Sequence, residues 1–162
     1  MNPLDSRPHF TATVERLPRL LKQLVACEPI SVIDRASLPN TPAIYAFFEN
    51  GQPVYVGRSG KKNGLKKRIG NHTQKNHHQA SFVYKLTCLE LGLPRIYKAG
   101  SGGTRAERMS DPNFQNEFAL RRQRLFNMQV RYVEVHDDID QYLLELYASI
   151  EFGLDLSGFS TH

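Results

Sequence analysis

The sequence predicts an α+β domain in which helices pack against a small sheet. Two short apolar segments joined by a turn signal predict a β-hairpin, an alternating segment near residue 130 predicts a third strand, and segments with helical periodicity surround them. The chain has 162 residues, of which 40% are hydrophobic and 23% are charged. This length and balance suit one globular domain of ordinary size.

The strands are predicted from residue types and alternation. Residues 43–48 and 54–57 are rich in aromatic and β-branched side chains. The link between them, residues 49–53, contains Asn50-Gly51, the dipeptide most typical of a tight hairpin turn. In residues 128–135 the even positions from Met128 to Tyr132 share one side and the odd positions from Gln129 to Val135 share the other. We therefore expect an antiparallel hairpin and a third strand.

Helices are expected over residues 11–27, 64–74, 80–91, 113–127 and 138–152, where apolar or basic residues recur at helical spacing. Pro18 lies inside the first segment and predicts either a start near residue 17 or a bend. In the third segment the expected apolar stripe runs from Phe82 to Leu89. Residues 1–40 are expected to form an N-terminal helical extension that packs on a main body of residues 41–162.

The charge favours a polyanionic partner. Twenty-one Lys and Arg residues against 16 Asp and Glu residues give a net charge of +5 and a pI of about 9.3. Basic side chains that neutralise phosphates release counterions, which favours binding to nucleic acid. The basic residues cluster in segments 61–68 and 121–124, although a charge run by itself fits a solvated surface equally well.

Other features predict a cytoplasmic protein without a membrane anchor. The apolar runs are too short to cross a bilayer. Asp5 and Pro8 stand where a signal peptide needs a basic start and an apolar stretch. Cys27 and Cys88 form neither a disulfide framework nor a zinc-like spacing.

Five side-chain positions could together cleave a phosphodiester. The hairpin carries Tyr45 and Tyr55, and Arg68 and His72 lie four residues apart and so share a helix face. The last helix supplies a carboxylate, either Glu145 or Glu151. The carboxylate would hold a divalent metal, the arginine would offset phosphate charge, and a tyrosine or histidine would move a proton. Each residue also has an ordinary interpretation as packing or solvated surface, so these residues favour nucleic-acid binding and only permit cleavage.

The order of motifs resembles that of the GIY-YIG nuclease family. Its paired signature is similar to Pro42-Ala43-Ile44-Tyr45 followed by Tyr55-Val56-Gly57-Arg58-Ser59. Residues 65–72 resemble the segment with the family's arginine and histidine, residues 142–148 resemble the helix with its metal-binding glutamate, and residues 156–162 resemble its closing segment. The resemblance implies a small three-stranded antiparallel sheet flanked by helices, and metal-dependent hydrolysis of DNA at a single-metal site.

The resemblance also implies a role for each residue. Tyr45 would be the general base or relay for the attacking water, and Tyr55 would orient the nucleophile or phosphate. Arg68 would stabilise charge on the phosphoryl oxygens, and His72 would contact phosphate or carry a proton. Glu145 would bind Mg²⁺, a hard ion suited to a carboxylate and waters, with Mn²⁺ as a substitute.

Further DNA contacts are expected from three basic residues, Arg58, Lys66 and Lys67. The motif context favours Glu145 as the metal ligand. On a helical wheel, however, Leu143, Leu146 and Ile150 define the expected packed stripe, and Glu151 lies closer to that stripe. Glu151 therefore remains the alternative ligand.

Two positions depart from the family pattern and support an alternative function. Ala43 replaces the first motif glycine, a change that we expect to be tolerated, and Ser157 stands where the family places an asparagine. A nucleic-acid-binding module that keeps the nuclease fold with little or no catalysis is therefore the alternative to a Mg²⁺-dependent DNA endonuclease.

Overall fold

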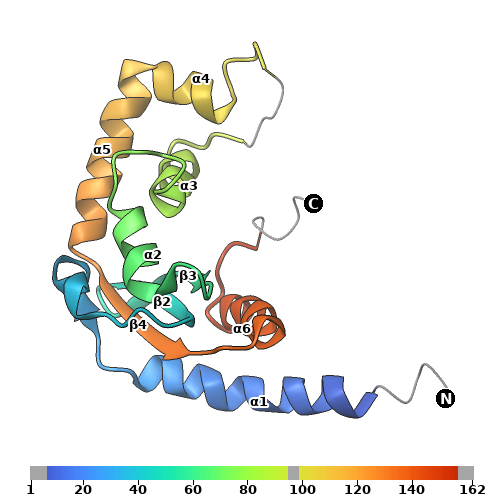
Figure 1. The fold of residues 1–162 in the computed structure, drawn as a ribbon. Coiled ribbons are helices and arrows are strands. Elements are labelled where there is room, and N and C mark those ends of the chain that lie inside the picture. The colour runs from blue at the N-terminus through green and yellow to red at the C-terminus, as the bar shows by residue number, and fades with distance from the viewer. Residues whose placement is uncertain (1–6, 95–98, 157–162) are drawn as a thin grey trace.

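The computed structural model describes residues 7–94 and 99–156, which form an α+β fold (Figure 1). The fold class expected from the sequence is therefore confirmed. The elements in chain order are α1 (Arg7–Ala26), β1 (Ile30–Ser31), the 3₁₀ helix η2 (Val32–Ser37), β2 (Ala43–Glu49), β3 (Gln52–Ser59), α2 (Gly64–His72), α3 (Ser81–Glu90), α4 (Arg105–Ser110), α5 (Pro112–Phe126), β4 (Gln129–Glu134) and α6 (Asp138–Glu151).

The sheet is antiparallel, with strand order β1-β4-β2-β3. Strands β2 and β3 form the expected hairpin, and Asn50 and Gly51 make its turn with φ values of 52° and 78°. Strand β4 is the expected third strand. The fourth strand, β1, was not predicted, because two residues are too few to show an alternating pattern.

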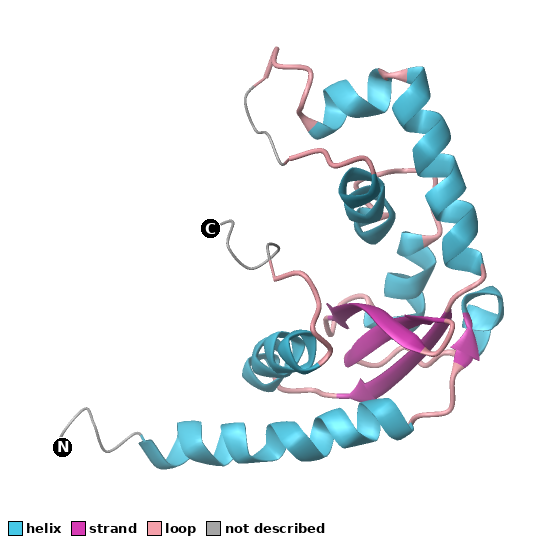
Figure 2. Ribbon diagram, turned by 180° about the vertical axis from the view of Figure 1, so that it is seen from behind, coloured by secondary structure: helices cyan, strands magenta, loops and turns pink. Residues whose placement is uncertain are grey.

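Strand β2 lies between two hydrophobic cores, since alternate side chains of a strand point to opposite faces. Tyr45 and Phe47 belong to the core that contains residues of α2, α3 and α5. Ile44 and Ala46 belong to the core that contains residues of α1 and α6. Figure 2 shows the sheet with α1 and α6 on one side and the remaining α-helices on the other. The two faces of this one strand thus face different helix layers.

The N-terminal helix is longer than predicted. It begins at Arg7 and continues through Pro18, so neither a start near residue 17 nor one at residue 11 is correct. Pro18 has no N–H group, so the Val14 carbonyl lacks its usual helical hydrogen-bond donor. Because Pro18 is exposed, water can donate to this carbonyl instead. Helix α1 packs against β4 and α6, where Arg16 and Asp140 form an ion pair of 2.8 Å. Packing of this segment on the body is observed, while a domain boundary near residue 40 stays a prediction.

Helix α4 was missed, although its start carries a recognisable signal. The Thr104 side chain accepts a hydrogen bond from the Glu107 amide, and the Glu107 carboxylate accepts one from the Thr104 amide. This reciprocal pair is the Thr-x-x-Glu capping box. The expected stripe of α3 is also wrong at its end, because Leu89 is 53% exposed while Thr87 and Cys88 are buried.

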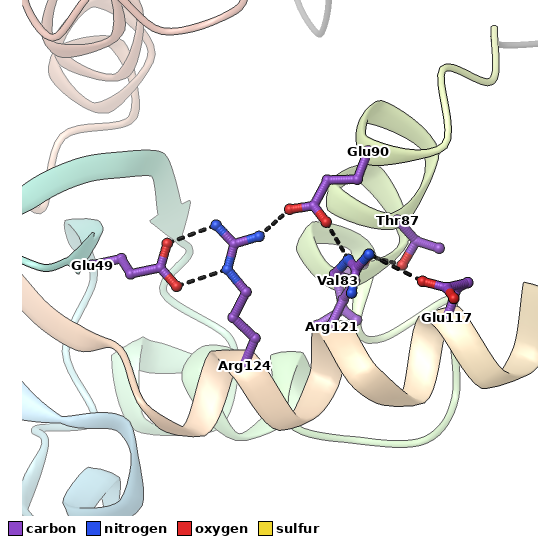
Figure 3. A network of polar contacts seen from close by, with 7 residues as sticks. All are labelled: Glu49, Val83, Thr87, Glu90, Glu117, Arg121 and Arg124. Carbon is purple, nitrogen blue, oxygen red and sulfur yellow. Dashed lines mark hydrogen bonds and ion pairs between the residues drawn. The ribbon is translucent and has the colours of Figure 1, made fainter.

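Arginines of the basic cluster at residues 121–124 form ion pairs within the protein. Figure 3 shows Arg124 between Glu49 and Glu90, and Arg121 between Glu90 and Glu117. Arg124 donates two hydrogen bonds to Glu49, of 2.7 Å and 2.6 Å, in the paired geometry that suits guanidinium and carboxylate. These arginines therefore join α5 to β2 and α3.

The Arg122 side chain of the same cluster is also engaged. Its Nε donates a 2.6 Å hydrogen bond to the Thr73 carbonyl, and its guanidinium lies over the Phe126 ring. The arginines of this run are thus partly exposed, and their charges also serve contacts between elements.

The Glu49–Arg124 pair predicts an acid-sensitive contribution to stability. Hydrogen bonds from Arg124 lower the pKa of Glu49 below its ordinary value of 4.5, so the pair stabilises the fold above that pH. This stabilisation is lost as the pH falls through the lowered pKa. We expect Glu49→Gln to lower the free energy of unfolding by about 1 kcal/mol at pH 7, because the pair is partly exposed.

Urea unfolding at pH 7 and pH 3 tests this prediction, with the exposed Glu15→Gln as the control variant. The difference between Glu49→Gln and the unmodified protein should shrink at pH 3. A difference that is equally large at both pH values would contradict an ionic contribution.

Candidate active site

Four elements bring the five predicted catalytic residues into one site. Tyr45 lies on β2, Tyr55 on β3, Arg68 and His72 on α2, and Glu145 on α6. The Tyr45 hydroxyl lies 2.6 Å from His72 Nε2. The charges of Arg68 and Glu145 both act on the pKa of each tyrosine, lowering it and raising it respectively. The tertiary structure therefore assembles residues that are separated by up to 100 positions, from 45 to 145, in the sequence.

Gly57 allows the Tyr45 ring to occupy its place. The two residues are directly paired across β2 and β3. A Cβ at position 57 would lie 2.5 Å from the Tyr45 hydroxyl, 2.7 Å from its Cζ and 2.8 Å from Cε1 of Tyr55. Only a residue without a side chain fits there, which explains the glycine after the second tyrosine in physical terms.

Tyr45 and His72 form a buried, uncharged pair. Both side chains have no exposed surface. Burial raises the pKa of Tyr45 well above 10, and burial together with the Arg68 charge lowers the pKa of His72 well below 6.5. His72 Nδ1 has no hydrogen-bond partner among the described residues. An unpartnered buried N–H is costlier than an unpartnered acceptor, so this favours the tautomer in which Nε2–H donates to Tyr45.

Tyr55 is less enclosed than Tyr45. Its side chain is partly exposed and borders a cavity of about 80 Å³. The ring packs on Phe82, with centroids 4.5 Å apart. Burial raises the pKa of Tyr55, while the Arg68 charge lowers it. The lining of the cavity that Tyr55 borders includes neither Arg68 nor Glu145.

Arg68 is the cation of the site. It remains protonated, because the neighbouring Tyr45 and Tyr55 raise its pKa against the opposing effect of burial. Its Nη2 donates a 3.3 Å hydrogen bond to the Ser81 hydroxyl at the start of α3. Ser81 was not predicted as a site residue, since a lone serine at a helix start normally indicates only capping.

Glu145 is the carboxylate that lies beside the other four residues, whereas Glu151 is not the buried carboxylate that the helical wheel suggested. The buried residues of α6 are Gln141, Leu144, Ala148 and Ser149, and Glu145 lies on this face with its side chain 18% exposed. Glu151 is exposed. The expected stripe was incorrect because Leu146 and Ile150 point to solvent, at 36% and 52% exposure.

Partial burial raises the pKa of Glu145, while the charges of Arg58 and Arg68 lower it. The Arg58 Nε donates a 3.1 Å hydrogen bond to Glu145 Oε2, and the Arg58 guanidinium lies 3.8 Å from the Tyr142 ring centroid. Arg58 is thus held between two α6 side chains. Tyr142 was not predicted as its partner, because a cation–π contact between distant segments leaves no local sequence signal.

The other predicted DNA-binding residues lie on the outer side of α2. Lys67 is exposed and Lys66 is partly exposed, whereas Leu65 and Ile69 are buried in the core. Ala43, which replaces the first motif glycine, is buried in β2, and its N–H donates a 3.0 Å hydrogen bond to the Ser59 hydroxyl. The extra methyl group is accommodated by the packing. Ser157 lies outside the described residues.

The donor set suits a hard cation rather than a transition metal. Within residues 7–94 and 99–156, no three His, Cys, Asp or Glu side chains form a group suited to metal binding. This argues against a zinc-type site with three or four protein ligands. Glu145 Oε1 accepts no hydrogen bond from this part of the chain, which leaves one carboxylate oxygen for a cation that takes its other ligands from water and phosphate.

Comparison with known proteins finds one partial relative. A segment of 64 residues is 36% identical to UvrABC system protein C from Christiangramia forsetii (strain DSM 17595 / CGMCC 1.15422 / KT0803). The match covers 38% of this chain and 10% of that protein. No family model matches the chain. No solved structure matches it either. Among the helices that the structure describes, none is long and apolar enough to cross a membrane.

Proposed function

We propose that this protein is a metal-dependent endonuclease that hydrolyses DNA phosphodiester bonds at a single-metal site of the GIY-YIG type. The observation that carries the proposal is the convergence of Tyr45, Tyr55, Arg68, His72 and Glu145, which were predicted from separate motifs. The partial similarity to UvrABC system protein C is a second, weaker observation in support of the proposal.

The charges in the site fit phosphoryl transfer. Glu145 would hold one Mg²⁺, with Mn²⁺ as a substitute, and a bound divalent ion supplies charge neutralisation and a more acidic water. Arg68 places a permanent positive charge beside the tyrosines, where it would stabilise negative charge that develops on the phosphoryl oxygens. Arg58 limits the movement of the Glu145 carboxylate through its hydrogen bond to Oε2.

Burial divides the proton-handling roles between the tyrosines. Tyr55 is less enclosed than Tyr45 and His72, and in this proposal it contacts the attacking water or the phosphate. In this proposal Tyr45, whose hydroxyl accepts a hydrogen bond from His72 Nε2–H, would stabilise negative charge that develops on the Tyr55 oxygen. Because His72 is fully buried, it acts through Tyr45 in this proposal and does not touch phosphate.

Plasmid cleavage tests the proposal directly. Purified protein with Mg²⁺ should nick supercoiled DNA, and EDTA should stop the reaction. Supercoiled, linear and branched DNA that all stay intact while the protein binds them would contradict nuclease activity. That outcome would instead support a nucleic-acid-binding module that retains the fold.

The Arg58–Glu145 pair predicts a shift in the pH dependence of cleavage. Glu145 must be ionised to hold the metal, and burial raises its pKa above the ordinary 4.5. Arg58 opposes that rise, so Arg58→Gln should raise the pKa further and move the acid limb of the rate to higher pH. The measurement is the single-turnover rate between pH 5 and 8 at fixed Mg²⁺, with the exposed Arg19→Gln as the control variant. If the acid limb of the rate does not move in Arg58→Gln, Arg58 does not affect the ionisation of Glu145.

A further inference from the structure

A basic hollow lies at the start of α2, outside the five-residue site. It has a volume of about 440 Å³, and its lining includes Lys61, Lys62, Lys66 and Lys67, together with Asn40 and Asn63. We call it the lysine hollow. Its lining contains no carboxylate from residues 7–94 or 99–156. Four ammonium groups around one concave surface repel one another, so a phosphate that binds there would relieve this repulsion.

These lysines differ from five other cations of the described residues, which form ion pairs with carboxylates. Arg16, Arg58, Arg121 and Arg124 form ion pairs with carboxylates, and Lys85 pairs with Asp155. None of the four lysines takes part in an ion pair within the described ranges. Residues 61–68 contain four lysines and Arg68 without any carboxylate, which is five positive charges, equal to the chain's net charge of +5.

The backbone holds the lysine hollow in place. Three N–H groups at the start of α2 donate to carbonyls: Gly64 to Gly60 at 2.9 Å, Leu65 to Thr41 at 2.9 Å, and Lys66 to Pro39 at 3.0 Å. A Cβ at Gly64, whose φ is 62°, would lie 2.6 Å from the Asn40 backbone. The helix amides are therefore occupied, and an anion would be bound by lysine side chains on a pre-formed scaffold.

The lysine hollow and the active site use different faces of one helix. Lys67 is exposed and directly precedes Arg68, which points toward the tyrosines and Ser81. One helical turn advances only about 5.4 Å, so the two sites are close along the helix axis. A phosphate bound by the lysines would therefore lie next to the phosphate bound by Arg68, and the two would be different phosphates.

We propose that the lysine hollow binds backbone phosphates of duplex DNA that flank the scissile phosphate. The proposal rests on the proposed nuclease function for the identity of its ligand. The four lysines are positioning residues: they hold the duplex so that a neighbouring phosphate reaches Arg68 and Glu145, and they take no part in the chemical step.

The test is the salt dependence of binding to a 20-base-pair duplex in EDTA, where no metal-dependent cleavage occurs. Each neutralised phosphate contributes about 0.9 to the slope of log affinity against log salt. Replacing Lys61, Lys62, Lys66 and Lys67 with glutamine should therefore reduce the slope by about 2 or more, which corresponds to at least two lost contacts. A slope that changes by less than about 0.5 would overturn the proposal, since not even one contact would be lost.

The matched control is the double variant Arg19→Gln and Lys22→Gln. Both residues are exposed on α1, which packs on the other face of the sheet from α2, so the slope should not change. An equal effect per removed charge in both variants would show that net charge matters rather than the lysine hollow, and would overturn the proposal. Selective loss of affinity for duplex RNA, with DNA binding kept, would also overturn it.

Cleavage kinetics separate this proposal from the nuclease proposal. If both hold, the glutamine variant should lose activity mainly through a higher KM and much less through kcat. If the protein binds DNA through the lysines but does not cleave it, the nuclease proposal is refuted and the proposal for the lysine hollow stands. If the glutamine variant cleaves DNA with an unchanged salt slope and an unchanged KM, the proposal for the lysine hollow is refuted and the nuclease proposal stands.

Discussion

Glu145→Gln is expected to abolish Mg²⁺-dependent DNA cleavage while DNA binding persists. Glu145 is the carboxylate whose charge acts on Tyr45 and Tyr55, and glutamine keeps its size but removes the negative charge that a hard cation requires. We expect kcat to fall by at least about 100-fold, the usual cost of one group that stabilises the transition state. The measurement is single-turnover cleavage of plasmid DNA, with binding measured separately in EDTA.

The matched control is Glu151→Gln, on the same helix. Glu151 is exposed, so its replacement should leave kcat within about twofold, as expected for a surface substitution away from the site. Cleavage that survives Glu145→Gln and is lost in Glu151→Gln would contradict the geometry of α6 described above.

The free energy of unfolding of Glu145→Gln shows whether the substitution removes only the metal ligand or also disrupts the fold. The raised pKa of Glu145 means that the folded state disfavours its charge, so its contribution to stability decreases as the pH rises above 4.5. Removing the charge should therefore leave the free energy of unfolding at pH 7 unchanged or higher. A large loss of stability would show that the Glu145–Arg58 pair is mainly structural.

Gly57→Ala is expected to damage the site and the fold together. The new Cβ would meet the Tyr45 hydroxyl at 2.5 Å and Tyr55 Cε1 at 2.8 Å, and both rings are packed against neighbouring aromatic side chains. One methyl group would force the rings or the β2–β3 pair apart. We expect a loss of about 1–3 kcal/mol in the free energy of unfolding, as for overpacked cores, and at least a 100-fold loss of cleavage, since displaced groups are costly.

Gly70→Ala is the matched control, because a Cβ at Gly70 meets no atom within 4 Å. Gly70 lies inside α2 between Arg68 and His72, where alanine is the better helix former by up to about 1 kcal/mol. This variant should therefore be as stable as the unmodified protein or more so. Urea unfolding and plasmid cleavage of both variants suffice, and an active, stable Gly57→Ala protein would show that the close approach of Tyr45 is not required.

Local signals in the sequence predicted most of the regular structure. The Asn50-Gly51 turn, the alternation in β4 and the periodicity of α2, α3, α5 and α6 each depend on residues close together in the chain. The failures have local causes too. Strand β1 has two residues, and α1 passes through Pro18 at an exposed position where the missing hydrogen bond costs little.

The helical wheel of α6 failed for a different reason. Hydrophobicity alone placed Leu146 and Ile150 inside, but the face that packs on the sheet carries Gln141 and Ser149. Gln141 is satisfied there by hydrogen bonds to the Ser59 and Val135 carbonyls, of 3.0 Å and 2.7 Å. Which polar residues can be buried depends on partners from β3 and on the end of β4, and no pattern within α6 contains that information.

The sequence by itself determined the α+β class, the hairpin, and the motif residues Tyr45, Tyr55, Arg68, His72 and Glu145, because these depend on residue type, order and spacing. Only the tertiary structure showed that Glu145 lies beside the other four residues while Glu151 is exposed, and which basic side chains form ion pairs. The arginines of α5 meet carboxylates of β2 and α3, whereas the lysines at the start of α2 meet none within the described part of the chain. The physical reason is that charge compensation and burial are set by contacts between segments that are distant in the chain.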